Sequence, residues 1–326
     1  MRHFVLILAA ISMLTPVSRL ASTQLAERPA RDRTETLEHD GVKRTYLVHL
    51  PRRFDPEKAH PLVFAIHGGG GRADRFDRST RGTMTAAADA RGFVVVFPQG
   101  VNKQWNDGRT EHIQRERGRA QTHDDVGFFE KLIDTMHEKH GIDRDRVFAT
   151  GISNGGFMSM RLAVDLSDKI AAVAPVTAQL SKAIADRRPA RPISVMIVNG
   201  TADPLVPFDG GHVRLGRFGR SRGEILSTAD TIERFRKHNE CTAHASVTKI
   251  PNRNRFDGSH ATITRYTGGL GETEVVLVRV VDGGHTWPGG QQYLPKRVVG
   301  TVCRDFDASA MILDFFLRHR RTRRAL

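Results

Sequence analysis

The segment that most constrains the fold of this chain is Gly151-Ile152-Ser153-Asn154-Gly155, which has the form G-x-S-x-G. Residues 146–150 before it have the pattern of a buried strand, and residues 156–163 after it have the composition of a helix. Glycine on both sides permits a sharp, strained turn, because no Cβ crowds the serine. So short a pattern also arises by chance, but between a strand and a helix it predicts a tight turn that presents Ser153 as a nucleophile.

A serine nucleophile of this kind needs an acid and a histidine later in the chain. The apolar pattern of residues 193–198 ends in a turn that carries Asp203, and the β-branched pattern of residues 274–281 leads into a glycine-rich loop that carries His285. Side chains that follow parallel strands meet at one edge of the sheet. We therefore predict His285 as the base and Asp203 as the acid that orients it. The alternatives are a turn-forming aspartate and a surface or packing histidine.

A second glycine-rich loop follows an apolar strand pattern and reads His67-Gly68-Gly69-Gly70-Gly71. Loops of this type supply backbone N–H groups that stabilise the oxyanion formed when a serine attacks a carbonyl. We expect Gly69 and Gly70 to donate from this loop, and Asn154 to donate from the residue after the nucleophile. A phosphate-binding loop would need a lysine and a serine or threonine after the last glycine, and neither stands there.

These motifs follow one another in the order of a known family, at His67–Gly71, Trp105 and residues 124–128, 149–156, 171–176, 199–203 and 285–290. From about Gly41 to His319 the chain resembles the esterase family that contains poly(3-hydroxybutyrate) depolymerases, feruloyl esterases and acetyl-xylan esterases. The resemblance implies an α/β-hydrolase fold, with a mostly parallel central sheet flanked by helices in a single domain. It also implies the nucleophile, acid and base roles for Ser153, Asp203 and His285. It leaves the acyl group open, because the family spans polyester, hydroxycinnamoyl and acetyl esters.

Some residues within these motifs have two interpretations. Asp124 and Asp125 suggest a metal site, but we expect them to open a helix over residues 126–134 with Asp125 as its N-cap. Trp105 and Trp287 either line the acyl pocket or pack in the core. We expect no metal and no cofactor.

The N-terminus predicts export. A short basic start precedes an apolar run over residues 4–14, which is typical of a signal peptide. An uncleaved anchor is the alternative. No Pro/Gly/Ser-rich linker interrupts the rest of the chain. We assign residues 1–26 to a signal peptide, 27–40 to an N-terminal extension, 41–319 to the catalytic domain and 320–326 to a basic tail.

Cys241 and Cys303 are the only cysteines of the 326-residue chain. In an exported protein they are candidates for one disulfide, with two unpaired buried thiols as the alternative. The formal net charge of +14 and the arginines of residues 318–324 could attract polyanions weakly. No specific nucleic-acid binding is expected, because no such motif accompanies the charge, and a solvated basic surface is the plainer interpretation.

Together these features predict a secreted or periplasmic serine carboxylesterase that forms an acyl-enzyme. Its expected substrates are feruloyl or acetyl esters of polysaccharides, or short polyhydroxyalkanoate esters. The alternatives are a serine peptidase of the same fold and a non-catalytic, surface-associated binding protein. Residues 101–123 and 208–223 are expected to shape the acyl pocket, and their composition gives no periodicity from which side-chain directions follow.

Overall fold

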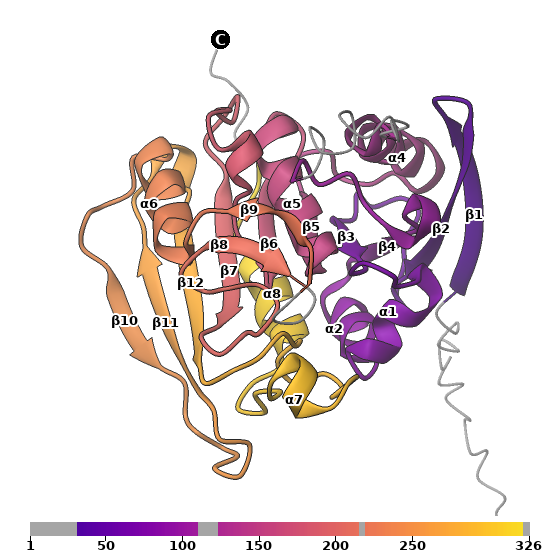
Figure 1. Ribbon diagram of the computed structural model, residues 1–326. Helices are drawn as coiled ribbons and strands as arrows, with labels where there is room; N and C mark the ends of the chain where they lie inside the picture. Colours follow the sequence, from indigo (N-terminus) through magenta and orange to yellow (C-terminus); the bar gives the residue numbers. More distant parts are fainter. Residues whose placement is uncertain (1–30, 110–122, 215–218, 322–326) are drawn as a thin grey trace, which may run out of the picture.

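One ten-stranded sheet runs through the protein (Figure 1), whose computed structural model describes residues 31–109, 123–214 and 219–321. Neighbouring strands run parallel from β4 to β12, and the strands outside them pair antiparallel. In spatial order the strands are β1 (Arg31–His39), β2 (Val42–Leu50), β4 (Val94–Pro98), β3 (Leu62–Ile66), β5 (Val147–Ile152), β6 (Ala172–Val176), β7 (Ser194–Gly200), β12 (Val275–Val281), β11 (His260–Tyr266) and β10 (Ser246–Lys249).

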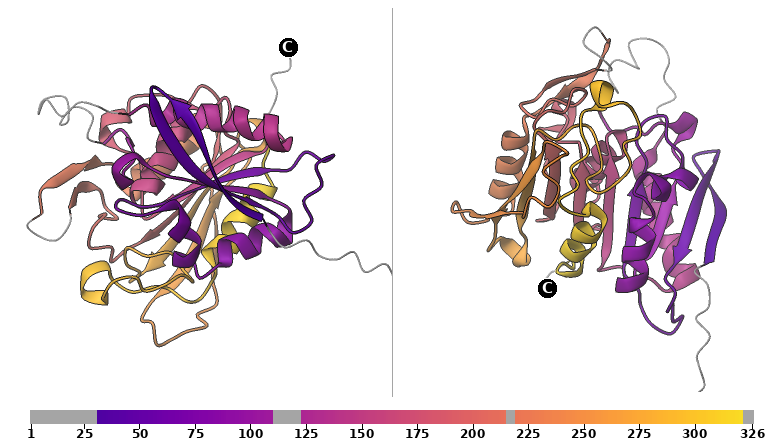
Figure 2. Two further views of the ribbon diagram at one scale, coloured as in Figure 1. Left: turned by 90° about the vertical axis from the view of Figure 1, so that its right-hand side faces the viewer. Right: turned by 90° about the horizontal axis from the view of Figure 1, so that it is seen from below.

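Helices cover both faces of this sheet (Figure 2). One face packs against α4 (Asp125–His140), α5 (Asn154–Asp165) and α6 (Thr228–His238). The other packs against α1 (Ala73–Ser79), α2 (Thr83–Arg91) and α8 (Ala308–Leu317). The remaining elements are the short helix α7 (Lys296–Val299), the ribbon of β8 (Gly211–Arg214) and β9 (Ser221–Ile225), and the 3-10 turns Val101–Lys103, Lys182–Ile184 and Leu270–Glu272.

The central strands are apolar along their whole length because both of their faces are buried. In β3, Phe64 and Ile66 point into the core beneath α4 and α5, whereas Val63 and Ala65 point into the core beneath α8. Consecutive side chains of a strand alternate between faces, so one short apolar run serves two cores. The sheet thereby holds the carboxyl ends of its parallel strands at one rigid edge.

The strands and helices predicted around the motifs are confirmed. β5, β7 and β12 match the three strand patterns, and α5 matches the helix expected after Ser153. The N-cap prediction was wrong by one residue. Asp124 caps α4 by accepting a hydrogen bond from the Gly127 N–H at 3.0 Å. Asp125 is instead buried, with its carboxylate 2.6 Å from the Arg44 guanidinium.

The sheet also begins earlier than the sequence suggested. Residues 31–39, assigned above to an extension, form β1 and pair with β2 along their whole length. Charged side chains interrupt the apolar pattern by which a strand is recognised in a sequence, so this strand was not predicted. Such charges are common on exposed edge strands. At the other end, the backbone N–H of Arg321 donates to the Asp145 carbonyl at 2.7 Å, so the start of the basic tail is attached to the body. The signal-peptide prediction concerns residues outside the described ranges.

Cys241 and Cys303 are both buried and unpaired, which is the second of the two alternatives given for them above. They belong to the cores on opposite faces of the sheet, so the sheet itself separates them. No helix in the described part of the chain has the length and apolar content needed to cross a membrane.

Candidate active site

Ser153 occupies the turn between β5 and α5 in a strained conformation. Its φ of 57° and ψ of −122° lie outside the regions that a residue with a side chain ordinarily adopts. Two hydrogen bonds hold the turn, because the Ser153 N–H donates to the Val176 carbonyl at 3.0 Å and to Thr177 Oγ1 at 3.1 Å. The end of β6 therefore fixes the backbone of the serine.

Gly155 explains how α5 can start so close to the sheet. A Cβ at this position would collide with the backbone carbonyl oxygens of Ile66 and His67 at the end of β3. Backbone atoms cannot rotate away as a side chain can, so the site requires glycine. The close approach brings the first turn of α5 against the glycine-rich loop that follows β3.

Asp203 and His285 form a buried pair at the same edge of the sheet. Asp203 Oδ2 lies 2.7 Å from His285 Nδ1, and both side chains are less than 5% exposed. The other carboxylate oxygen, Oδ1, accepts hydrogen bonds from the N–H groups of Leu205 and Val206 at 2.8 and 2.9 Å. With both oxygens engaged, the carboxylate is fixed and orients the imidazole ring.

The loop that carries His285 packs tightly on its neighbours. The His285 N–H donates to the Val299 carbonyl at 2.6 Å, and a Cβ at Gly284 would collide with that same carbonyl group. Tyr293 donates its hydroxyl hydrogen to the His285 carbonyl at 3.0 Å. Burial raises the pKa of Tyr293, and the negative charge of Asp203 raises it further, so the phenol keeps its proton at neutral pH.

Ser153, Asp203 and His285 all follow parallel strands at their carboxyl ends, as predicted. Among the described residues, Ser153 Oγ makes no hydrogen bond, either with His285 or with any other group. Hydrogen bonds between a nucleophile and its base are often long until substrate binds. The structure thus joins Asp203 and His285 directly and places Ser153 on the same edge of the sheet.

The glycine loop differs in one respect from the prediction. The Gly70 N–H donates to the Lys103 carbonyl at 2.8 Å, so it is occupied and does not face the serine. Gly68 stands closer, since a Cβ built on it would lie 3.5 Å from the Ser153 Cβ. The N–H groups of Gly68 and Gly69 donate no hydrogen bond to any of the residues that the structure describes.

His67 and Asn154 attach this loop to the segment that follows β4. His67 Nε2 accepts from the Gly100 N–H at 3.0 Å and Nδ1 lies 2.8 Å from the Gly68 carbonyl, which assigns a neutral ring protonated at Nδ1. Burial lowers the pKa of His67, in agreement with the neutral form. The Asn154 side chain accepts from the Trp105 N–H at 2.9 Å and donates to Asp107 at 2.6 Å.

Both tryptophans pack, which is one of the two interpretations left open above. Trp105 is 5% exposed and donates from its indole N–H to the His67 carbonyl at 2.9 Å. Trp287 is 3% exposed, and its indole N–H donates to Ser309 at 3.2 Å. Trp105 thus packs against the loop at His67, and Trp287 joins the His285 loop to α8. The segments expected to shape the acyl pocket fall partly outside the described residues.

Sequence reasoning missed Thr177 and Tyr293, the residues that hold the serine turn and the histidine loop. Neither belongs to a motif, and their contacts come from strands and loops distant in sequence. Thr177 does follow a strand at its carboxyl end, and that position alone could have identified it.

Comparison with known sequences places this site in context. Residues 44–210, about half of the chain, match the profile of the family described as esterase PHB depolymerase. The chain is 32% identical to NocK of Nocardia uniformis subsp. tsuyamanensis, a protein named as an esterase, over 94% of this chain and 88% of that protein. It is 28% identical to feruloyl esterase B of Piromyces equi, over 76% of this chain but only 44% of that longer protein.

Comparison with solved structures shows the fold. A crystal structure described as a thermostable esterase superposes with a TM-score of 0.53 at 14% identity, over 89% of this chain and 63% of that one. The chain therefore has the α/β-hydrolase fold, with its mostly parallel sheet covered by helices on both faces.

The close approach at Gly155 leads to a prediction. Gly155→Ala should lower the activity at least tenfold and destabilise the protein by about 1–3 kcal/mol, because the new methyl group has only backbone atoms to displace. Ester hydrolysis and thermal unfolding measure the two effects. Ser159→Ala is the matched control, since this buried hydroxyl of the same helix bonds only the Gly155 carbonyl. Equal activity of the two variants would contradict the prediction.

Proposed function

The chain belongs to the esterase PHB depolymerase family and is a carboxylic ester hydrolase, and on that premise we propose that Ser153, His285 and Asp203 are its catalytic triad. The observation that carries the proposal is the buried pair of Asp203 and His285, 2.7 Å apart. The strained backbone of Ser153 at the end of β5 supports it, because a nucleophile held on such a turn is exposed to substrate.

In this proposal, a serine hydroxyl that is a weak nucleophile is activated by its neighbour. His285 Nε2 takes the Ser153 proton as Oγ attacks the ester carbonyl, and then gives the proton to the departing alcohol. Asp203 keeps the ring protonated at Nδ1 and stabilises the imidazolium that forms. Water, activated by the same histidine, then releases the acid from the acyl-enzyme.

The oxyanion formed at each step needs hydrogen-bond donors. We assign this role to the N–H group of Asn154, the residue after the serine, and to that of Gly68 or Gly69. Gly68 lies near Ser153, and neither glycine N–H donates to another described residue. The Gly70 N–H is left out because Lys103 occupies it. Each such donor is worth about a hundred- to thousandfold in rate.

For substrates, we propose feruloyl or acetyl esters of polysaccharides, or short polyhydroxyalkanoate esters. The support is the family itself and the relatives named feruloyl esterases. Weak association with acidic polysaccharides is proposed from the net charge of +14.

We also propose that residues 1–26 direct export to the periplasm or medium, on the pattern of their sequence. A reporter fused after Arg33 is expected outside the cytoplasm, and its retention there would contradict export.

The triad is tested by comparing the wild type with Ser153→Ala on p-nitrophenyl acetate, butyrate and octanoate and on methyl ferulate. We expect hydrolysis by the wild type and a loss of at least about a thousandfold in the folded variant, since the nucleophile is gone. The ranking of the four substrates measures the size of the acyl pocket. Wild type that is folded but inactive on all four would favour a non-catalytic binding protein, and an active Ser153→Ala would refute the nucleophile.

A further inference from the structure

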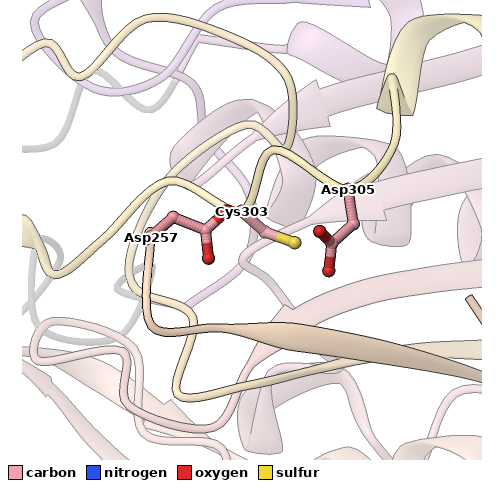
Figure 3. Close-up of side chains that lie close together, drawn as sticks. All are labelled: Asp257, Cys303 and Asp305. Carbon is pink, nitrogen blue, oxygen red and sulfur yellow. The ribbon is translucent and has the colours of Figure 1, made fainter. Parts of the chain in front are cut away.

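Three potential metal ligands meet at residues 299–305, the segment that is hydrogen-bonded to the His285 loop. Figure 3 shows the side chains of Asp257, Cys303 and Asp305, whose ligand atoms all lie within 4.8 Å of one another. Asp257 comes from the connection between β10 and β11, and the other two come from the segment before α8. Cys303 and Asp305 are 1% and 2% exposed, and Asp257 is 9% exposed.

One oxygen of this cluster has no partner among the described residues. Asp305 Oδ1 accepts from the N–H groups of Arg253 and Asn254 at 2.9 and 3.1 Å, whereas Oδ2 is buried and makes no hydrogen bond. In Figure 3 the Asp305 carboxylate turns toward the Cys303 sulfur. A buried carboxylate oxygen left without a partner is costly, so its environment lacks a donor or a cation.

Hydrogen bonds also fix the side chain of Asp257, the third residue of the cluster. Its Oδ1 accepts from the Ser259 N–H and hydroxyl at 2.7 and 2.8 Å, and its Oδ2 accepts from the Arg304 N–H at 2.8 Å. A carboxylate oxygen has two lone pairs, so Oδ1 is fully occupied and Oδ2 keeps the capacity for one further partner. Asp257 and Asp305 thus bring two carboxylates to the same buried thiol.

From this geometry we propose that Asp257, Cys303 and Asp305 bind one divalent cation of the zinc type. A thiolate with two carboxylates suits Zn²⁺, whereas Ca²⁺ and Mg²⁺ take oxygen ligands alone. Bond lengths of about 2.3 Å to sulfur and about 2.0 Å to oxygen imply that the three side chains draw closer on binding. The thiol proton leaves to solvent as the Zn–S bond forms, and a water completes the four ligands.

The cation would stabilise the segment on which the His285 loop rests. Four hydrogen bonds join that segment, residues 299–303, to the loop. The N–H groups of Gly284, His285 and Gly289 donate to the carbonyl groups of Thr301, Val299 and Cys303 at 3.0, 2.6 and 2.8 Å, respectively. The Thr286 hydroxyl donates to the Thr301 carbonyl at 3.0 Å. The Thr301 hydroxyl also donates to the Asp257 carbonyl at 3.0 Å. The role proposed for the ion is therefore structural. An effect of the ion on ester hydrolysis, through the position of His285, would rest in addition on the proposed function.

The test uses the full chain, freed of metal with a chelator and then titrated with Zn²⁺ in a calorimeter. Wild type should bind one equivalent and unfold a few degrees higher with the metal present. Cys303→Ala and Asp305→Asn should bind at least tenfold more weakly. Cys241→Ser, which changes the other buried thiol on the opposite face of the sheet, is the matched control and should bind like the wild type.

The second measurement replaces Zn²⁺ with Co²⁺ and records the absorption spectrum. It uses only the wild type and Cys241→Ser. A Co²⁺ ion bound by Cys303 gives a thiolate charge-transfer band in the near ultraviolet, so the test stands even if a site variant fails to fold. Zinc bound equally by folded Asp305→Asn, or no zinc and no cobalt band in folded wild type, would overturn the proposal. The latter result would leave only a thiol–carboxyl contact.

Discussion

The close contact between the start of α5 and the end of β3 is the constraint on which the rest of the site depends. Gly155 passes so near the carbonyl groups of Ile66 and His67 that any side chain would separate the two elements. This contact forces the turn at Ser153 to be sharp, and the resulting positive φ is maintained by hydrogen bonds from Ser153 to Val176 and Thr177. Strain in one residue is thereby balanced by the packing of three neighbouring strands.

The second half of the site depends on packing of a different kind. His285 lies on a loop after β12, and its backbone is held from the outside by residues 299–303 rather than by the sheet alone. Asp203 reaches its ring from the neighbouring strand β7, because β7 and β12 are parallel and in contact. The orientation of the ring thus combines a rigid sheet edge with a loop held by residues 299–303, which include Cys303 and lie beside Asp257 and Asp305.

The sequence predicted those features that arise from local pattern. Apolar runs marked β3, β5, β7 and β12, and glycine-rich turns after three of them marked Ser153, His285 and the loop at His67. Features that depend on distant contacts were missed or mistaken. β1 has too much charge to resemble a strand, and its role follows only from pairing with β2. Gly70 lies in the expected loop, yet its N–H is occupied by Lys103, which no local pattern reveals.

The cysteines illustrate the same limit. Two cysteines in a chain with an export pattern suggest a disulfide, but whether they can meet depends on the face of the sheet that each occupies. Cys303 instead lies beside Asp257, which is remote in sequence, so the cluster has no recognisable spacing. Local pattern therefore pointed to the residues proposed as the triad, whereas the residues that hold them in place became apparent only in the three-dimensional structure.

Covalent labelling tests the central claim most directly. The protein is incubated with a fluorophosphonate, weighed intact by mass spectrometry, and digested to locate the adduct. The account predicts one adduct per chain, on Ser153, which is lost in Ser153→Ala and slowed strongly in His285→Ala because the serine then lacks its base. Folded wild type that stays unmodified, or an adduct on a different residue, would contradict it.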